Sequence, residues 1–253
     1  MPRLDQMLVE RGLAPSRSAA QRLIERGAVR WRSGGAPWEA PRKAGQELPQ
    51  HAEVDVTDVA ELRWASRAGL KLEGALSALG LSVQGCMALD VGQSTGGFTD
   101  VLLSQGARRV VGVDVGHGQL LQRLREDPRV ACIEGCNARE LSAAQLQSEW
   151  PTGGFDWIVG DLSFISQILV WPALKTLLSS QGQMLMLVKP QFELRPQDIG
   201  KGGLVRDEAL LGSLCERMSQ AAHAQGLRVL NWIDSPITGG DGNREFFIHM
   251  RVT

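Results

Sequence analysis

Charged side chains stand at the ends of several short apolar runs. Asp161 and Lys189 each directly follow such a run, Glu245 begins another, and Lys71 lies upstream of all of them. If the runs are parallel strands with one antiparallel strand at the end, Asp161, Lys189 and Glu245 meet at a single edge of a sheet. Taken alone, each of these charged side chains could simply be solvated at the rim of the sheet. Three charges that meet beside a glycine-rich loop are harder to explain by solvation, and no histidine, cysteine or serine there suits covalent catalysis.

A glycine-rich loop follows the first apolar run of the larger part of the chain, from Asp90 to Phe98. Asp114 closes the next run, where a carboxylate can accept both ribose hydroxyls of an adenosyl cofactor. Asn137 follows the third run, where it could face the adenine. These positions indicate an S-adenosylmethionine site. The expected cofactor-binding residues are Asp90, Gly92, Ser94, Thr95, Gly96, Gly97, Phe98, Asp114, Asn137 and Asp161.

Three other interpretations use the same loop. A dinucleotide fingerprint fits badly, because Ser94 stands where the second glycine belongs. Gly92–Gly96 also has the pattern G-x-S-x-G, the nucleophile elbow of hydrolases. Of the downstream histidines, however, His117 precedes any plausible acid, His223 lies inside a predicted helix and His249 inside the last predicted strand. A glycine turn that binds no ligand is the third.

Short apolar runs alternate with helical stretches from residue 67 onward, which predicts a parallel sheet with helices on both faces. The predicted strands are 87–91, 110–114, 130–133, 157–161, 184–188, 229–233 and 245–252. The predicted helices between them are 97–105, 118–126, 140–149, 164–179 and 207–225. Only a turn rich in proline and glycine separates the last two strands, so they should be antiparallel. The expected fold class is therefore α/β, Rossmann-like, with seven strands and the last one antiparallel.

The first 60 residues have a different pattern. Two short helices, the second with Ser16 as N-cap and Gly27 at its end, precede two alternating segments around Val29–Trp31 and Glu53–Val56. Residues 1–32 carry seven arginines, a local basic excess. We expect a small α+β domain over 1–60, a linker over 61–66 and the larger domain over 67–253. The expected RNA-binding residues are Arg3, Arg17, Arg22, Arg26, Lys201 and Arg206.

Composition narrows the class of protein. The 253 residues have a formal net charge of −1, so any nucleic-acid contact must come from a local patch. No apolar stretch approaches the roughly 18 residues that a membrane span needs, and the first residues lack the apolar run of a signal peptide. Four cysteines are too few for a disulfide framework, and their spacing does not predict a metal site. A cytoplasmic protein with reduced thiols, without stable membrane association and monomeric, is expected.

Several motifs together resemble a known family. Asp90–Phe98, Asp161, Lys189–Glu193 and Asn243–Phe246 are similar to FtsJ-type ribose 2′-O-methyltransferases, and Arg3–Asp5 with Ser16–Val29 resembles an S4 RNA-binding domain. With Val113–Leu120 and Gly200–Asp207 added, the whole chain resembles the TlyA (hemolysin A-like) family. It departs from that family's pattern at Gln93, where alanine is expected, and at Ala68, where glycine is common.

The resemblance implies an activity and partners. The FtsJ-type Lys-Asp-Lys-Glu tetrad maps onto Lys71, Asp161, Lys189 and Glu245, as the catalytic residues. The implied reaction is methyl transfer from S-adenosylmethionine to a ribose 2′-OH, with cytidine in ribosomal RNA or ribosomal subunits as the substrate. Two alternatives from other classes remain: a non-catalytic RNA-binding or ribosome assembly factor, and a membrane-active hemolysin, for which the sequence offers no span or barrel pattern.

Overall fold

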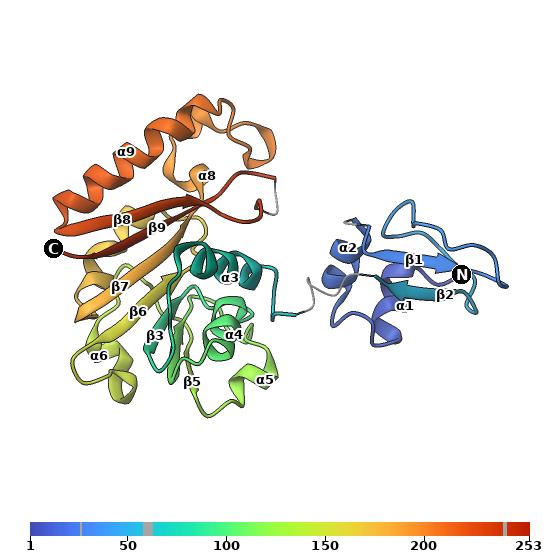
Figure 1. The fold of residues 1–253 in the computed structure, drawn as a ribbon, viewed down its shortest axis with the longest axis horizontal. Helices are drawn as coiled ribbons and strands as arrows, with labels where there is room; N and C mark the ends of the chain where they lie inside the picture. Colours follow the sequence, from blue (N-terminus) through green and yellow to red (C-terminus); the bar gives the residue numbers. More distant parts are fainter. Residues whose placement is uncertain (26, 58–62, 240–241) are drawn as a thin grey trace. The chain divides into compact units, whose positions relative to one another are not determined.

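The chain divides into two compact units, Met1–Arg67 and Ala68–Thr253, in this computed structural model. The structure describes residues 1–25, 27–57, 63–239 and 242–253. Two residues of the expected linker, 61 and 62, and one expected RNA-binding residue, Arg26, lie outside the described residues. Figure 1 shows the fold of each unit, and each is considered by itself below.

The first unit has two helices and a two-stranded antiparallel sheet. Its elements are α1 (Leu4–Glu10), α2 (Arg17–Glu25), β1 (Val29–Arg32) and β2 (Glu53–Val56). The Oγ of Ser16 accepts a hydrogen bond of 3.2 Å from the backbone of Ala19, which confirms the predicted N-cap. Gly27 has φ +72°, the left-handed conformation that ends a helix. Leu4, Leu8 and Leu23 form the centre of a small apolar core.

The second unit is built on a seven-stranded sheet of order β5-β4-β3-β6-β7-β9-β8. The strands are β3 (Met87–Val91), β4 (Arg109–Val113), β5 (Val130–Ile133), β6 (Phe155–Gly160), β7 (Leu178–Val188), β8 (Leu227–Asp234) and β9 (Phe246–Val252). β9 runs antiparallel to both of its neighbours, whereas the pairs from β5 to β7 are parallel. The predicted α/β fold with an antiparallel last strand is confirmed.

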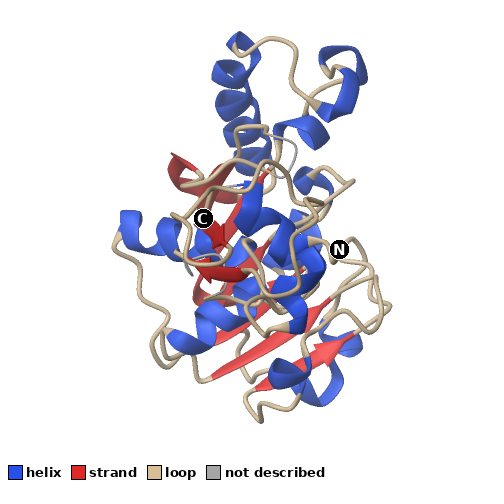
Figure 2. Cartoon of the chain, turned by 90° about the vertical axis from the view of Figure 1, so that its right-hand side faces the viewer, coloured by secondary structure: helices blue, strands red, loops and turns tan. Residues whose placement is uncertain are grey.

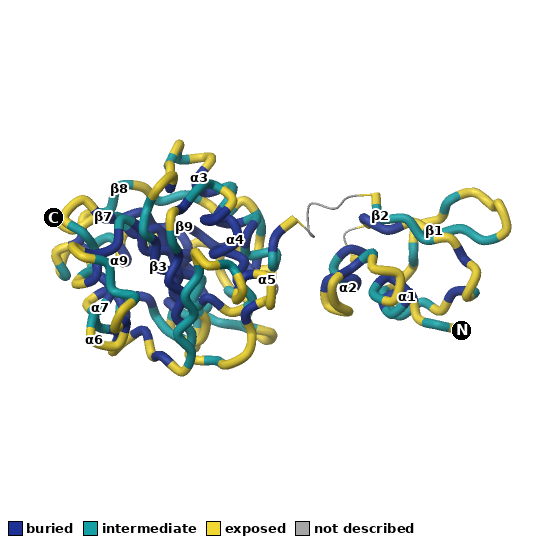
Figure 3. The backbone as a smooth tube through the Cα atoms, turned by 90° about the horizontal axis from the view of Figure 1, so that it is seen from below, coloured by how far each residue is buried: buried dark blue, intermediate teal, exposed yellow. Residues whose placement is uncertain are grey.

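Helices cover both faces of this sheet, as the blue and red elements of Figure 2 show. They are α3 (Ala68–Leu79), α4 (Gly97–Ser104), α5 (Gln122–Arg125), α6 (Ala143–Leu146), α7 (Trp171–Lys175), α8 (Pro190–Glu193) and α9 (Ala209–Ala224). The strands in the middle of the sheet are buried, and the connecting loops are exposed (Figure 3).

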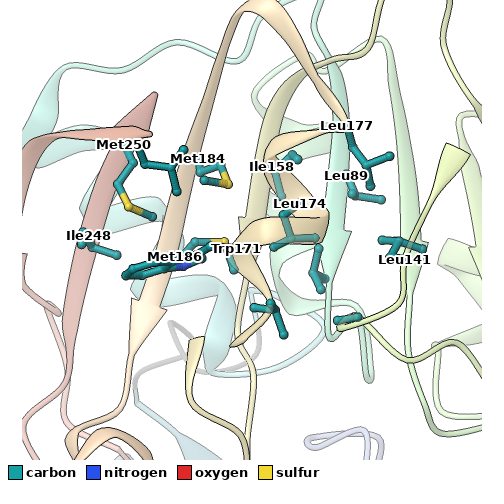
Figure 4. Packing of buried hydrophobic residues seen from close by; sticks show 14 of the residues in the cluster. Leu89, Leu141, Ile158, Trp171, Leu174, Leu177, Met184, Met186, Ile248 and Met250 are labelled. Carbon is teal, nitrogen blue, oxygen red and sulfur yellow. The ribbon is translucent and has the colours of Figure 1, made fainter. Parts of the chain in front are cut away.

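The main core lies between one face of the sheet and helices α6, α7 and α9. Trp171 packs there against Met184, Met186 and Ile248 from neighbouring strands (Figure 4). Side chains alternate between faces along a strand. Asp90, which lies between the core residues Leu89 and Val91, therefore points to the opposite face.

Three predicted helices differ from the structure. The helix predicted over 164–179 is a 3-10 turn, Gln167–Leu169, followed by α7, and residues 178–179 already belong to β7. Phe164 has φ +64° and Pro172 lies in the first turn of α7, so the helix cannot begin earlier. The helix over 118–126 shortens to α5, since Gly118 has φ +66°. The helix over 140–149 is α6 and a 3-10 turn. In addition, α3 was not predicted at all.

Candidate active site

The glycine loop connects β3 to α4. Gly92 has φ +82°, and a Cβ there would lie 2.8 Å from the carbonyl oxygen of Asp161. Only glycine therefore lets the loop pass this close to the end of β6. Gly96, with φ +96°, is the N-cap of α4.

Asp114, directly after β4, holds this loop from the neighbouring strand. Its Oδ2 accepts a hydrogen bond of 2.7 Å from the backbone of Ser94, and its Oδ1 accepts one of 2.7 Å from the backbone of Gly116. A carboxylate has about four lone-pair sites, so acceptor capacity remains on both oxygens. Ser94 Oγ lies 3.0 Å from Gln119 Oε1, and no histidine within the described ranges bonds it as a nucleophile elbow requires.

A cavity of about 410 Å³ opens beside this loop at the carboxyl edge of the parallel strands. Five of the expected cofactor residues line it: Gly92, Ser94, Asp114, Asn137 and Asp161. The other five, Asp90, Thr95, Gly96, Gly97 and Phe98, lie outside its lining. Phe98 is 3% exposed and stacks on Phe247, with ring centroids 6.2 Å apart, so it packs in the core.

Asp90 belongs to a buried polar chain beneath the loop. Thr99 Oγ1 donates a hydrogen bond of 2.7 Å to Asp90 Oδ2, and Gln93 Nε2 donates one of 2.9 Å to Thr99 Oγ1. Burial raises the pKa of the Asp90 carboxyl to about 7, and the hydrogen bonds of Thr99 oppose this only in part. Asp90 therefore supports the loop through the hydrogen bonds of Thr99 and Gln93.

The four charged residues singled out in the sequence form two ion pairs. Lys71 Nζ, from α3, lies 2.5 Å from Glu245 Oε2 just before β9. Lys189 Nζ, just after β7, lies 2.5 Å from Asp161 Oδ1, just after β6. Val188 is paired in register with Phe246, so Lys189 and Glu245 meet at the same edge of the sheet.

The two pairs influence each other. Burial raises the pKa of Glu245, the adjacent Lys71 lowers it in part, and the charges of Asp161 and Lys189 also act on it. The Lys71–Glu245 pair is buried, with side chains 7% and 2% exposed, whereas Lys189 and Asp161 are more open at 12% and 16%. The more open pair also borders the cavity, through Asp161.

Three residues that the sequence did not indicate complete this edge. Ser163 Oγ lies 2.8 Å from Lys189 Nζ. Phe164 is 90% exposed beside the cavity and lies 5.1 Å from Phe192, centroid to centroid. Glu193 accepts hydrogen bonds from the hydroxyl of Ser166 and the backbone of Gln167, which ties the loop after β6 to α8. Phe164 has φ +64°, an uncommon backbone conformation for a bulky residue. Because a backbone angle is not visible in the sequence, nothing there singled out Phe164.

Two expected RNA-binding arginines of the first unit share one carboxylate. Asp5 is fully buried and accepts hydrogen bonds of 3.1 Å from both Arg3 and Arg17. Burial raises the pKa of Asp5, but the bonds from Arg3 and its other donors outweigh burial and hold the pKa well below its usual range. The two arginine side chains are 44% and 51% exposed, so they are held in place and still open to solvent. Arg22 lies on α2.

The other two expected RNA-binding residues lie on one loop of the second unit. Lys201 and Arg206 are exposed, and Ile199 pairs with Val205 across this loop. Asn243 donates a hydrogen bond of 2.9 Å to the carbonyl of Gly203, and its Oδ1 accepts one of 3.0 Å from the backbone of Val205. The loop is therefore fixed to the segment that carries Glu245.

Residues 64–252 match the family described as FtsJ-like methyltransferase. The chain belongs to the FtsJ-like methyltransferase family. Residues 2–30 match the S4 domain. The FtsJ-like fold and the donor cavity agree with a methyltransferase that uses S-adenosylmethionine.

Relatives of this FtsJ-like chain cover nearly its full length. It is 43% identical to the 16S/23S rRNA (cytidine-2′-O)-methyltransferase TlyA of Mycobacterium tuberculosis, over 99% of this chain and 90% of the relative. It is 36% identical to "Hemolysin A" of Brachyspira hyodysenteriae, over 99% of this chain and all 100% of the relative. The solved structure of a "putative hemolysin" from Streptococcus thermophilus superimposes with a TM-score of 0.76 at 38% identity, over 99% of this chain and 88% of that one.

Within the described ranges, no helix is both long and apolar enough to cross a bilayer. In the same part of the chain, no group of three or more histidine, cysteine, aspartate or glutamate side chains could hold a metal ion.

Proposed function

We propose that this protein transfers a methyl group from S-adenosylmethionine to the ribose 2′-OH of cytidine in ribosomal RNA. The observation that carries the proposal is the Lys189–Asp161 ion pair at the mouth of the donor cavity, backed by the buried Lys71–Glu245 pair. The name of the relative from Mycobacterium tuberculosis supports the substrate, and the S4 match supports RNA as its class. Because ribosomal RNA is its substrate, the protein would act in the cytoplasm.

The cavity suits an adenosyl donor. Its volume of about 410 Å³ is within the range of small-molecule sites. Asp114 retains acceptor capacity for the two ribose hydroxyls, and Asn137 would meet the base. Gly92 and Ser94 would leave room for the donor along the loop. When bound, the donor supplies an electrophilic methyl group on its sulfonium.

Lys189 would orient the attacking hydroxyl. As an ammonium it has three N–H donors, of which Asp161 and Ser163 account for two. The third can donate to the 2′-oxygen and stabilise the negative charge that develops there. The proton of the hydroxyl leaves to the Asp161 carboxylate or to water as the C–O bond forms.

Lys71 and Glu245 would fix the other side of the target nucleotide. Because this ion pair is buried, the ammonium group of Lys71 is held in place. Its remaining N–H donors can bind the ribose or its phosphate. Such positioning converts a weak nucleophile into one held at about 3–3.5 Å from the methyl carbon.

RNA would be bound by the basic residues of both units. The domain over 1–60 would contact the phosphate backbone through Arg3, Arg17, Arg22 and Arg26. The loop with Lys201 and Arg206 would hold the RNA near the catalytic edge. Phosphate contacts of this kind provide affinity and salt dependence, and little base specificity.

The test is to map 2′-O-methylation in ribosomal RNA incubated with the protein and a labelled methyl donor. We expect label on the 2′-oxygen of one or a few cytidines. Binding of ribosomal RNA without any transferred methyl group would instead establish a non-catalytic RNA-binding factor. Methyl groups found on bases rather than on ribose would refute the proposed role of the Lys189–Asp161 pair.

A further inference from the structure

A second cavity lies at the opposite end of the sheet from the catalytic edge. It measures about 460 Å³, and its polar lining includes Lys175, Ser179, Ser180, Arg228 and Arg251. β7 connects the two places, since it begins at Leu178 beside this cavity and ends next to Lys189. A strand rises about 3.3 Å per residue, and the register with β6 places Leu178 about eight such steps from Lys189, so the two sites are roughly 25 Å apart along β7. The proposed reaction does not use this cavity.

Two of its arginines face each other across neighbouring strands. Arg228 of β8 and Arg251 of β9 are directly opposed in the register, and both are exposed. Like charges in this position destabilise a sheet. The two-stranded sheet of the first unit shows the usual solution, because its opposed pairs Arg30–Asp55 and Arg32–Glu53 are ion pairs.

Nothing in the described part of the chain neutralises the opposed arginines. The C-terminal residue Thr253 also lines this cavity, but neither its carboxylate nor that of a described side chain forms an ion pair with Arg228 or Arg251. The whole chain has a net charge of −1, so this concentration of positive charge is local. An anion between the two guanidinium groups would remove the repulsion.

The rest of the cavity supplies further donors. In the pairing of β6 with β7, Phe155 lies opposite Leu178 and Trp157 lies opposite Gln183. Between these two pairs β6 has one residue and β7 has four, Ser179–Gly182, so β7 forms a bulge. A Cβ at Gly182 would lie 2.6 Å from the carbonyl oxygen of Phe155, so glycine is required to close this bulge. The bulge presents the hydroxyls of Ser179 and Ser180. Lys175 Nζ donates a hydrogen bond of 2.6 Å to the carbonyl of Gln225 and keeps two N–H donors.

We propose that this cavity binds phosphate groups of the RNA backbone, as a contact remote from the catalytic edge. Guanidinium groups recognise phosphate through paired hydrogen bonds, and serine hydroxyls and lysine add the single contacts that complete such a site. The RNA assignment rests on the proposed function. A structured ribosomal RNA is large enough to reach both places, and a second anchor would fix the orientation of the enzyme on it.

The test measures the affinity of the full-length protein for ribosomal RNA as a function of salt. The variant Arg228→Ser/Arg251→Ser should raise the Kd at least about tenfold at low salt and reduce the salt slope by roughly 1.4–1.8, since each of the two lost phosphate contacts contributes about 0.7–0.9. Arg228→Lys/Arg251→Lys keeps both charges and should keep most of the slope. Arg129→Ser is the matched control, because Asp127 already neutralises that exposed guanidinium, and it should change neither quantity.

Three outcomes decide the proposal. Wild-type slope and affinity in the double serine variant would overturn it, while methyl transfer by the same variant at saturating RNA would leave the proposed function intact. If inorganic phosphate binds the wild-type protein and not the double serine variant, with the RNA slope unchanged, the cavity holds small phosphates and the RNA assignment is wrong. A reduced salt slope of RNA binding in the double serine variant, with an unchanged methyl-transfer rate at saturating RNA, supports the proposed phosphate contact.

Discussion

Lys71 and Glu245 form a buried ion pair of 2.5 Å between α3 and the start of β9. Removing one partner of such a pair leaves the other charge buried and unpaired, which typically costs about 3–5 kcal/mol. We expect Lys71→Met to lower the free energy of unfolding by that amount in urea denaturation. The variant Lys71→Met/Glu245→Met should recover most of the stability and none of the methyl transfer. Equal instability of the single and double variants would contradict a coupled pair.

Gln93 and Gly112 form a complementary pair beneath the cofactor loop. A Cβ at Gly112 would lie 1.9 Å from the side-chain Cδ of Gln93, so Gly112→Ala forces Gln93 to move. Overpacking of this kind costs about 1–3 kcal/mol. We expect weaker S-adenosylmethionine binding by calorimetry in Gly112→Ala, and recovery in Gly112→Ala/Gln93→Ala. A double variant as weak as the single one would show that Gln93 is not the residue displaced.

Asp90 should make the stability depend on pH. Burial raises the pKa of its carboxyl from 3.8 to about 7, so between these values the folded protein keeps a proton that the unfolded chain releases. Its contribution to stability is therefore complete at low pH and is lost as pH rises toward 7. Asp90→Asn should lose less stability between pH 5 and pH 8 than the wild type, by urea denaturation.

The control for this comparison is Asp127→Asn. The guanidinium of Arg129 lowers the pKa of the partly exposed Asp127, so this carboxyl is ionised in both states from pH 5 to pH 8. The stability of Asp127→Asn should therefore change with pH over this range as the stability of the wild type does. The same pH dependence in Asp90→Asn as in the wild type would show that Asp90 is ionised in the folded protein.

Asp114 should control donor affinity. Hydrogen bonds to a charged group contribute about 1.5–3 kcal/mol, so Asp114→Ala should weaken S-adenosylmethionine binding by that range in calorimetry. Asp114→Asn keeps one acceptor oxygen and should lose less of the affinity for S-adenosylmethionine. Unchanged affinity in Asp114→Ala would remove this residue from the donor site.

The sheet follows from sequence patterns, and so does the meeting of Asp161, Lys189 and Glu245, because charges at the ends of apolar strands share one edge. Lys71 was placed with them only by the resemblance to FtsJ-type enzymes, and the pairing of the four charges into two ion pairs was not predicted.

The sequence pattern did not reveal α3, which has Gly69 and Gly74 inside it. Gly74 is explained only by tertiary contact, since a Cβ there would lie 2.6 Å from the Pro236 ring. Contacts between distant segments decide such positions, and no local pattern encodes them.

The loop after β6 was wrongly predicted as helix for a similar reason. Its apolar residues have helical spacing, but Ser163 and Glu193 fasten the loop to Lys189 and α8 in a conformation with Phe164 at φ +64°. The site itself thus overrides local propensity.

The most direct test of the account is the methyl-transfer rate of Lys189→Ala on ribosomal RNA, with saturating RNA and a separate calorimetric measurement of donor binding. Proton handling and charge stabilisation in the transition state contribute about 10²–10⁴-fold, so the rate should fall at least about 100-fold while donor affinity stays near that of the wild type. Lys43→Ala removes an exposed lysine that belongs to no proposed site, and this variant should transfer methyl at the wild-type rate under these conditions. A wild-type rate in Lys189→Ala would contradict the assignment of Lys71, Asp161, Lys189 and Glu245 as the catalytic residues.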